Sequence, residues 1–224
     1  MNSILSKNSL STSELCYLIA LIGGKTLPGI EFDGLAEMSL PEVRKFVDQV
    51  IRKLEGKSLI QVNFDGTVKI QEDFHTLLSA IAYADRVITQ TVGMHGEEFH
   101  FQYFLHDNNI VELVRKEQDV YLLQQIWAAH DLLAIIVERK GLTVESQGEE
   151  AGADSCTLIS YKIQENEIID VSELSFIKKD STLLYAQLEA DSDGESHKFR
   201  LIPIDYDGMM NKLVHYVMDL GVIV

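Results

Sequence analysis

Proline, glycine and cysteine are all scarce in this chain. Three prolines and 14 glycines among 224 residues exclude a collagen-like or linker-rich polypeptide. The two cysteines, Cys16 and Cys156, lie far apart and form no CxxC pair, which excludes a disulfide scaffold and favours buried thiols in a reducing compartment. Hydrophobic residues make up 46% of the chain, enough for a sizeable core, so the sequence predicts a globular protein.

Long apolar runs are also missing. The most apolar windows, residues 15–22 and 132–137, are much shorter than the roughly 20 residues that span a bilayer. Residues 1–11 lack the charged start and the apolar run of a signal peptide. We therefore expect a cytoplasmic protein without direct membrane insertion.

Basic side chains are fewer than acidic ones. The 35 acidic and 19 basic side chains give a formal net charge of -16. Binding to nucleic acid depends on neutralising phosphates with Lys and Arg, and an anionic membrane surface repels the same acidic excess. The charge therefore favours solubility and attraction to neutral or basic proteins.

The first 86 residues predict two helices, a hairpin and a third helix, an order close to that of a winged helix-turn-helix. Capping residues, glycine stops and an Asp-Gly turn mark the boundaries. The expected elements are a helix that Ser11 to Glu14 begins and Gly23-Gly24 ends, a helix from Ser39 to Gly56, a hairpin turning at Asp65-Gly66, and a helix over 71–86. Residues 1–86 are therefore predicted to form a winged-helix-like subdomain.

From residue 87 the hydrophobic period changes to two, which is typical of an antiparallel sheet with one face covered by helices. We expect strands over 87–92, 98–105, 109–115, 183–189 and 197–203, helices over 119–140 and 205–220, a short helix or strand over 157–164, and a mobile loop over 147–155. The predicted fold is α+β: an antiparallel sheet flanked by helices over 87–224, continuous with the first subdomain. An internal duplication stays open, without similarity between individual residues of the two halves.

Motifs for catalysis or metal binding fail on spacing. His95 and His106 lie in successive turns and His100 in mid-strand, too far apart to share an ion. Residues 191–195 resemble half of a calcium loop, but the twelfth position is an isoleucine. Residues 23–26 echo the end of a phosphate-binding loop without its first glycine. The sequence therefore predicts no metal, no cofactor and no enzyme, although an enzyme of unrecognised type would need only a pocket of converging titratable groups.

The winged-helix-like order leaves one alternative function open, a DNA-binding regulator. Its recognition helix would be residues 40–55, with basic residues that could meet phosphates. These are Arg44, Lys45, Arg52 and Lys53, with Lys57 just after the helix. Against it, Glu42, Asp48 and Glu55 lie on the same helix and Asp65 at the hairpin tip.

Residues 10–115 resemble EspG-like type VII secretion chaperones, in particular the Firmicutes branch of that family, which is similar to a staphylococcal secretion accessory protein. The likeness rests on Ser11 to Leu15, on the Leu27-Pro28-Gly29-Ile30 turn, on KSLIQVNFDGTVKI (57–70) and on IAYADRVITQTVG (81–93). It implies a cytosolic chaperone or adaptor, without catalytic residues, that binds a helical secretion substrate of WXG or LXG type and delivers it to the membrane secretion ATPase. The family's substrate-contact loop corresponds here to the short turn 93–96, which favours a different partner class.

A helical substrate with an apolar tip needs an apolar groove with a polar rim. Alternate positions of the strand over 98–105 carry bulky apolar groups, so the predicted partner-binding residues are Phe99, Phe101, Tyr103 and Leu105. The alternative is that this face is the core side of the sheet. Phe104 and His106 would then be the exposed residues.

Overall fold

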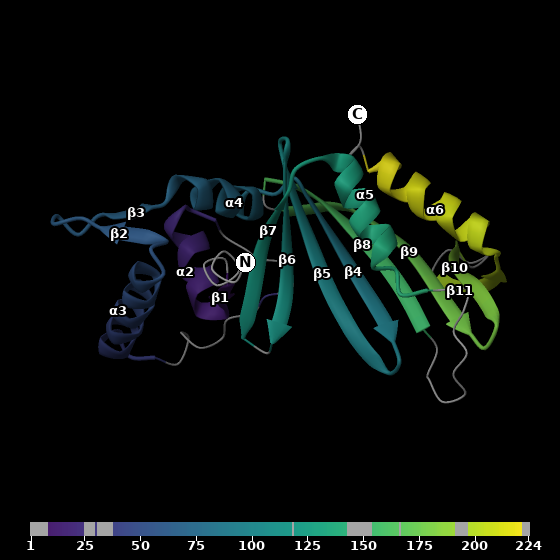
Figure 1. Ribbon diagram of the computed structural model, residues 1–224, viewed down its shortest axis with the longest axis horizontal. Helices are drawn as coiled ribbons and strands as arrows, with labels where there is room; N and C mark the ends of the chain where they lie inside the picture. The colour runs from purple at the N-terminus through teal and green to yellow at the C-terminus, as the bar shows by residue number, and fades with distance from the viewer. Residues whose placement is uncertain are drawn as a thin grey trace. The chain divides into compact units, whose positions relative to one another are not determined.

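The computed structural model describes residues 9–24, 30, 38–117, 119–142, 154–165, 167–190 and 197–220 (Figure 1). Its elements are, in chain order, β1 (Ser9–Ser11), α2 (Thr12–Leu21), α3 (Leu40–Gly56), β2 (Ile60–Val62), β3 (Val68–Ile70), α4 (Glu72–Ala82), β4 (Arg86–Met94), β5 (Glu97–His106), β6 (Asn109–Glu117), β7 (Val120–Ile126), α5 (Ala129–Glu138), β8 (Asp154–Gln164), β9 (Glu167–Lys179), β10 (Thr182–Ala190), β11 (His197–Pro203) and α6 (Tyr206–Asp219). None of the helices among these residues is long and apolar enough to cross a bilayer.

Nine strands are hydrogen-bonded in the order β1-β7-β6-β5-β4-β8-β9-β10-β11, and β2 pairs with β3 in a separate hairpin. Short connections between successive strands require antiparallel pairing. Four of these turns hold a non-glycine residue in the left-handed region, as two-residue hairpin turns do: His95, Asp107, Glu165 and Asp180, with φ between 51° and 54°. The predicted α+β class with an antiparallel sheet is confirmed.

Most of the predicted elements are confirmed, but some differ from the prediction. The helix predicted over 119–140 was wrong in its first part: residues 120–126 form β7, and only α5 is helical. The hydrophobic pattern of residues 121–126 fits a helix as well as a strand. The strand forms by pairing with Ser9–Ser11, a segment more than 100 residues away. Residues 157–164, predicted as a short helix or strand, are confirmed as part of strand β8, whereas β1 and β9 have no counterpart in the prediction.

The first compact unit comprises residues 1–87, 103–125 and 163–168. Its helix α2 begins as predicted, because Ser11 and Glu14 form a reciprocal capping box that satisfies exposed N–H groups. Gly23 ends it with φ +84°, a conformation that glycine adopts without strain. Apolar side chains of the three helices and of the adjoining segment make the core of this unit: Leu15, Leu18, Val50, Leu54, Leu59, Phe74, Leu78 and Ile81.

The second compact unit comprises residues 88–102, 126–162 and 169–224. Within it α5 packs against α6, and α6 lies on one face of the strands. The Tyr216 hydroxyl donates to the carbonyl of Ser172 at 2.7 Å, and the Lys212 ammonium lies 4.2 Å from the centre of the Tyr185 ring. The division of the chain at residue 86 stays a prediction.

Candidate partner-binding surfaces

The four residues predicted to bind a partner occupy alternate positions of β5, and their exposure falls from Phe99 to Tyr103 and rises again at Leu105. Phe99 is 39% exposed, Phe101 and Leu105 are half-buried, and Tyr103 is fully buried. The Arg139 guanidinium lies 4.5 Å from the centre of the Phe101 ring and covers part of it. In the described structure, Phe99 is therefore the member of this set that presents most of its surface to a partner.

The opposite face of β5 bears on the alternative in which the face of Phe99 and Tyr103 is the core side of the sheet. In that case Phe104 and His106 would be exposed, but Phe104 is fully buried and His106 is half-buried. In the first unit α4 packs against the neighbouring strand β6, so this part of the sheet is covered on more than one side. The alternation of side chains alone could not reveal that second layer, because it depends on where a distant helix packs.

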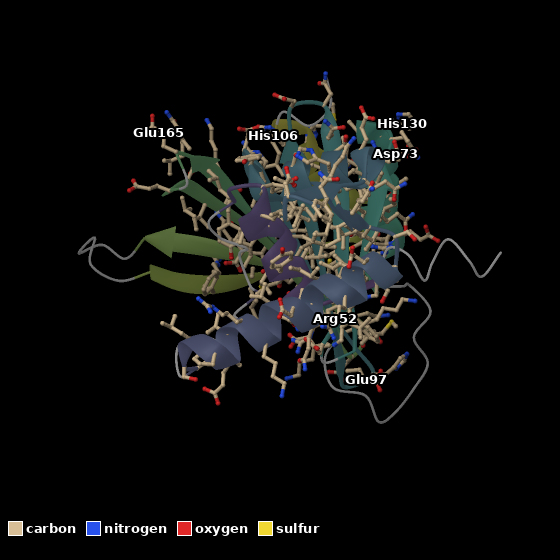
Figure 2. The ribbon with its side chains drawn as sticks, turned by 90° about the vertical axis from the view of Figure 1, so that its left-hand side faces the viewer. Arg52, Asp73, Glu97, His106, His130 and Glu165 are labelled. Atoms are coloured by element: carbon tan, nitrogen blue, oxygen red, sulfur yellow. The ribbon has the colours of Figure 1, made fainter. Side chains whose placement is uncertain are left out.

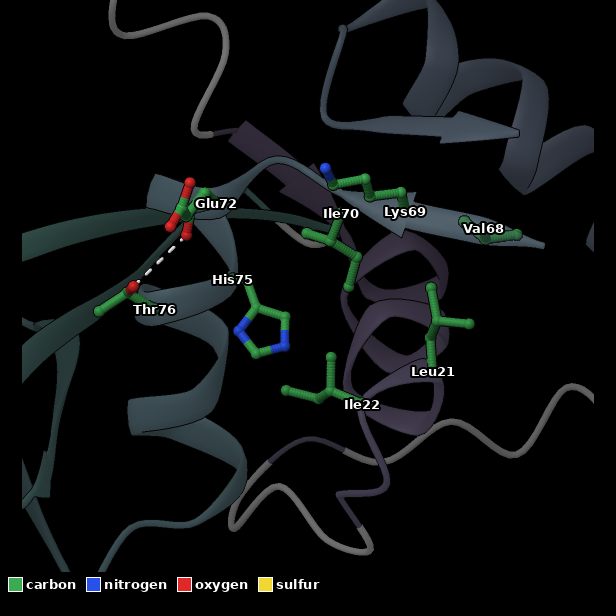
Figure 3. Close-up of a pocket in the computed structure, with 8 residues that line it drawn as sticks. All are labelled: Leu21, Ile22, Val68, Lys69, Ile70, Glu72, His75 and Thr76. Atoms are coloured by element: carbon green, nitrogen blue, oxygen red, sulfur yellow. Dashed lines mark hydrogen bonds between the residues drawn. The ribbon is translucent and has the colours of Figure 1, made fainter. Parts of the chain in front are cut away.

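An open groove lies in the first unit between the end of α2, strand β3 and the start of α4 (Figure 3). Its volume is about 670 Å³. Apolar groups come from α2 and β3, and polar groups from β3 and α4. The lining residues are Leu21, Ile22, Val68, Lys69, Ile70, Glu72, His75 and Thr76.

The chemistry of this groove suits another protein better than a small molecule. Ile70 is buried at 8% exposure and Leu21 is 38% exposed, whereas Lys69, Glu72 and His75 are exposed. Small-ligand pockets hold their ligand with a few buried, oriented polar groups. Here the polar groups stand at the solvent-facing rim around an apolar floor, the arrangement of a contact surface.

Three residues of the first unit place ligand-type atoms within 4.8 Å of one another: Asp85, His106 and Asp107. Asp85 Oδ2 lies 3.0 Å from His106 Nδ1, and Asp107 Oδ2 lies 3.8 Å from His106 Nε2. Both ring nitrogens thus already face a carboxylate, and both aspartates are exposed. His100 is paired elsewhere, with Thr91, so the histidines do not converge in this structure.

The two cysteines differ in depth. Cys156 is buried and Cys16 half-buried. Burial raises the pKa of the Cys156 thiol to about 11, partly offset by the Gln90 amide and Lys140. Burial, and then the carboxylate of Asp119, also raise the pKa of Cys16. Both groups are therefore neutral thiols near pH 7, the form that is a poor nucleophile.

The basic residues of α3 are exposed, as a phosphate-binding helix would require, and Arg52 is labelled in Figure 2. Lys57, the fifth predicted phosphate contact, is engaged inside the unit instead. Its ammonium donates to Glu14 Oε2 at 2.7 Å and to the carbonyl of Ser9 at 2.9 Å. This removes one cation from the predicted nucleic-acid surface, since Lys57 links α3 to α2 and β1.

The second unit carries an apolar surface that was not predicted from the sequence. Phe199 and Leu201 on β11 are 60% and 48% exposed, and Ile169 and Val171 on β9 are 50% and 55% exposed. The alternating pattern of residues 167–179 was the available signal. Phe64 at the β2–β3 turn is fully exposed, and it lies in the hairpin that the sequence predicted.

Some predicted features lie outside the described residues. They are residues 27–29 of the predicted turn, 147–153 of the predicted loop, and the calcium-like segment 191–195. The rest of the predicted loop, Asp154 and Ser155, begins strand β8.

Comparison with known proteins identifies the fold. No protein-family model matches the sequence, and no curated protein is similar to it. Among solved structures, the Mycobacterium tuberculosis type VII secretion system chaperone EspG5, in complex with the PE25-PPE41 dimer, superposes with a TM-score of 0.60. The match covers 94% of this chain and 95% of that chain at 10% sequence identity. At this identity the likeness shows a shared fold.

Proposed function

We propose that this protein is a cytosolic chaperone or adaptor of a type VII secretion system, of the Firmicutes branch of the EspG-like family. It binds a helical secretion substrate of WXG or LXG type and assists its delivery to the membrane secretion ATPase. It acts without catalysis, and residues 1–86 serve it as a winged-helix-like interaction module.

One observation carries the proposal: the fold of almost the whole chain matches that of a chaperone whose solved structure contains its PE25-PPE41 partner. A fold alone does not define a function, so the surfaces supply independent support. The groove of the first unit has an apolar floor and a charged rim, which suits side chains from a partner helix. Both cysteines carry raised pKa values, which disfavours covalent chemistry at either thiol.

On β5 the proposed contact is Phe99. Phe101, Tyr103 and Leu105 follow it at alternate positions of the same strand. An exposed aromatic side chain at a contact contributes by leaving water when the partner docks. Tyr103 is fully buried and presents no surface to a partner. A partner at Phe99 therefore meets the start of β5, near the turn at His95.

Co-expression with small helical proteins encoded beside this chain tests the proposal. We expect a stable complex on size-exclusion chromatography, and retention of the secretion ATPase by that complex on an affinity column. Phe99→Ser should weaken the complex about thirtyfold, because a hot-spot aromatic contributes on the order of 2 kcal/mol. Trp127→Ser, which removes an aromatic ring that is 81% exposed and lies outside both β5 and residues 1–86, is the matched control and should leave the complex intact.

The DNA-binding alternative is tested with the same protein. A labelled DNA duplex at low salt should not bind, because the net charge of -16 opposes it. Binding that falls steeply with added salt and is lost in Arg52→Glu would replace the chaperone proposal with a regulator. Failure of every helical candidate to co-purify, together with such binding, would leave the chaperone proposal without support.

A further inference from the structure

Strand β11 is the last strand in the order of the sheet, so β10 is its one partner among the described strands. The N–H of Ile204 donates to the carbonyl of Leu183 at 3.0 Å. In an antiparallel pair, alternate residues direct both backbone groups toward the partner strand. Phe199 and Leu201 therefore direct their N–H and C=O groups to the outer side of β11. Pro203 has the same orientation in the strand as Phe199 and Leu201, but it has no N–H. It therefore ends the row of outward backbone donors.

The two faces of β11 carry different side chains: Phe199 and Leu201 on one face, and Arg200 and Ile202 on the other. Tyr185, which lies under Lys212 of α6, is paired with Ile202 in the register. The neighbouring positions, Phe199 and Leu201, therefore lie on the face away from α6. Arg200 shares the face of Ile202 and is exposed.

The apolar face extends inward from the edge strand. Leu201 is paired with Ala186, and Leu184 of β10 is paired with Ile177 of β9. On β9, Val171 precedes Ser172, whose hydroxyl lies 3.1 Å from that of Tyr216 in α6. Val171 therefore points to the face opposite α6, where Glu173 and Ser175 separate it from Ile177 along β9.

The charge of β11 is unusual for this chain. Residues 197–203 contain two basic residues, Lys198 and Arg200, and no acidic residue, although the whole chain carries a net charge of -16. Opposite charges that face each other across neighbouring strands stabilise the pair, and like charges destabilise it. The edge strand thus selects acidic groups at the positions opposite Arg200.

We propose that β11 is a docking edge for an extended segment of a partner protein in which apolar and acidic residues alternate. The segment adds a tenth strand, with its backbone paired to Phe199 and Leu201. Its apolar side chains cover the exposed face of these two residues, and an acidic side chain lies opposite Arg200. This inference rests on the second unit alone and does not depend on the proposed function.

A second copy of this chain is a poorer occupant of the edge. Antiparallel pairing of two β11 strands with their apolar faces on one side would bring Arg200 of each copy close to the basic strand of the other. Like charges on neighbouring strands oppose such pairing. Two copies with a net charge of -16 each also repel one another.

The test uses the full chain and a short fluorescent peptide of alternating valine and glutamate, with binding measured by anisotropy. We expect saturable binding that is at least tenfold weaker for a peptide of the same composition with its valines and glutamates in two blocks. N-methylation at every second position of the alternating peptide should abolish binding for one set of positions and preserve it for the other, because a strand presents alternate N–H groups to each side. Equal effects of the two N-methylated sets, or equal affinity for the block peptide, would overturn the proposal.

Variants of the chain give the second test. Phe199→Ser with Leu201→Ser should weaken binding of the alternating peptide about tenfold, and Phe64→Ser is the matched control with no effect. Arg200→Glu should weaken binding of the valine–glutamate peptide and create binding of a valine–lysine peptide. This charge reversal keeps the test valid if the double serine variant fails to fold. An unchanged preference in Arg200→Glu would refute the charge argument, and a dimer that the serine variant abolishes would show that a second copy occupies the edge.

Discussion

The ion pair between Glu14 and Lys57 connects three elements of the first unit. Glu14 is 2% exposed, and its Oε2 accepts hydrogen bonds from the Lys57 ammonium at 2.7 Å and from the N–H of Ser11 at 2.7 Å. Lys57 also donates to the carbonyl of Ser9. One cation therefore joins β1, the start of α2 and the end of α3.

Removing the cation leaves a buried carboxylate without its opposite charge. Breaking a fully buried pair in this way costs about 3–5 kcal/mol. The Lys57 side chain is 32% exposed, so water can enter the site of the truncated residue, and we expect a smaller loss. Lys57→Met should lower the free energy of unfolding by roughly 1–3 kcal/mol.

Glu14→Gln should cost less, because its amide oxygen can still accept the Ser11 N–H. Lys57 can then turn its ammonium toward solvent, so we expect a loss of about 1 kcal/mol. The double variant should be less destabilised than the sum of the two single variants, because the buried charge and its partner are removed together.

Urea unfolding followed by circular dichroism measures these values, and amide hydrogen exchange in α2 assigns the loss to the first unit. Lys53→Met, which removes an exposed lysine from the same helix, is the matched control and should change stability by less than about 0.5 kcal/mol. If Lys57→Met is no more destabilising than this control, the ion pair contributes nothing. If the losses simply add in the double variant, the two groups are not coupled.

Three further predictions concern local geometry and pH. Gly141→Ala should lower the melting temperature clearly more than Gly66→Ala. Both glycines have positive φ, but an added Cβ would meet Val92 at 2.5 Å at position 141 and open space at position 66. The expected losses in the free energy of unfolding are about 3 kcal/mol for Gly141→Ala and about 1 kcal/mol for Gly66→Ala. Asp205→Ala should cost about 1 kcal/mol in urea unfolding, because it removes the side chain that caps α6, whereas Asp205→Asn should be nearly neutral; equal losses would exclude the capping explanation. Folding raises the pKa of Cys156 from 9.0 to about 11, so the thiol of the unfolded chain ionises first as the pH rises. In paired urea titrations, the stability of the protein should therefore fall by roughly 2 kcal/mol between pH 9 and pH 11 relative to Cys156→Ala. Parallel pH profiles of the two proteins would contradict this.

Sequence patterns were sufficient where a local signal sets the structure. The capping box of Ser11 and Glu14 and the Asp65-Gly66 turn both lie where predicted. Turn chemistry and capping depend on residues within three or four positions of each other. The helix starts, the hairpins and the antiparallel character of the sheet could therefore be derived from the chain alone.

The predicted partner surface illustrates what the pattern could not supply. Alternation placed Phe99 and Tyr103 on one face of β5, but their exposures, 39% and 0%, depend on which elements cover each end of the strand. The same limit explains Phe104: it would be exposed if the face of Phe99 and Tyr103 were the only core side, but packing buries it as well. Exposure is a property of the neighbours in space, and those neighbours come from distant segments.

The sequence by itself determined the α+β class, the acidic charge, most element boundaries and the lack of a recognisable catalytic motif, because each is written in composition or in short-range spacing. Only the tertiary structure decided that residues 120–126 are a strand, that Lys57 neutralises a buried Glu14, and that β11 stands at the edge with Phe199 and Leu201 uncovered. The physical reason is that pairing and burial depend on contacts between residues tens to more than 100 positions apart, and no local pattern specifies those contacts.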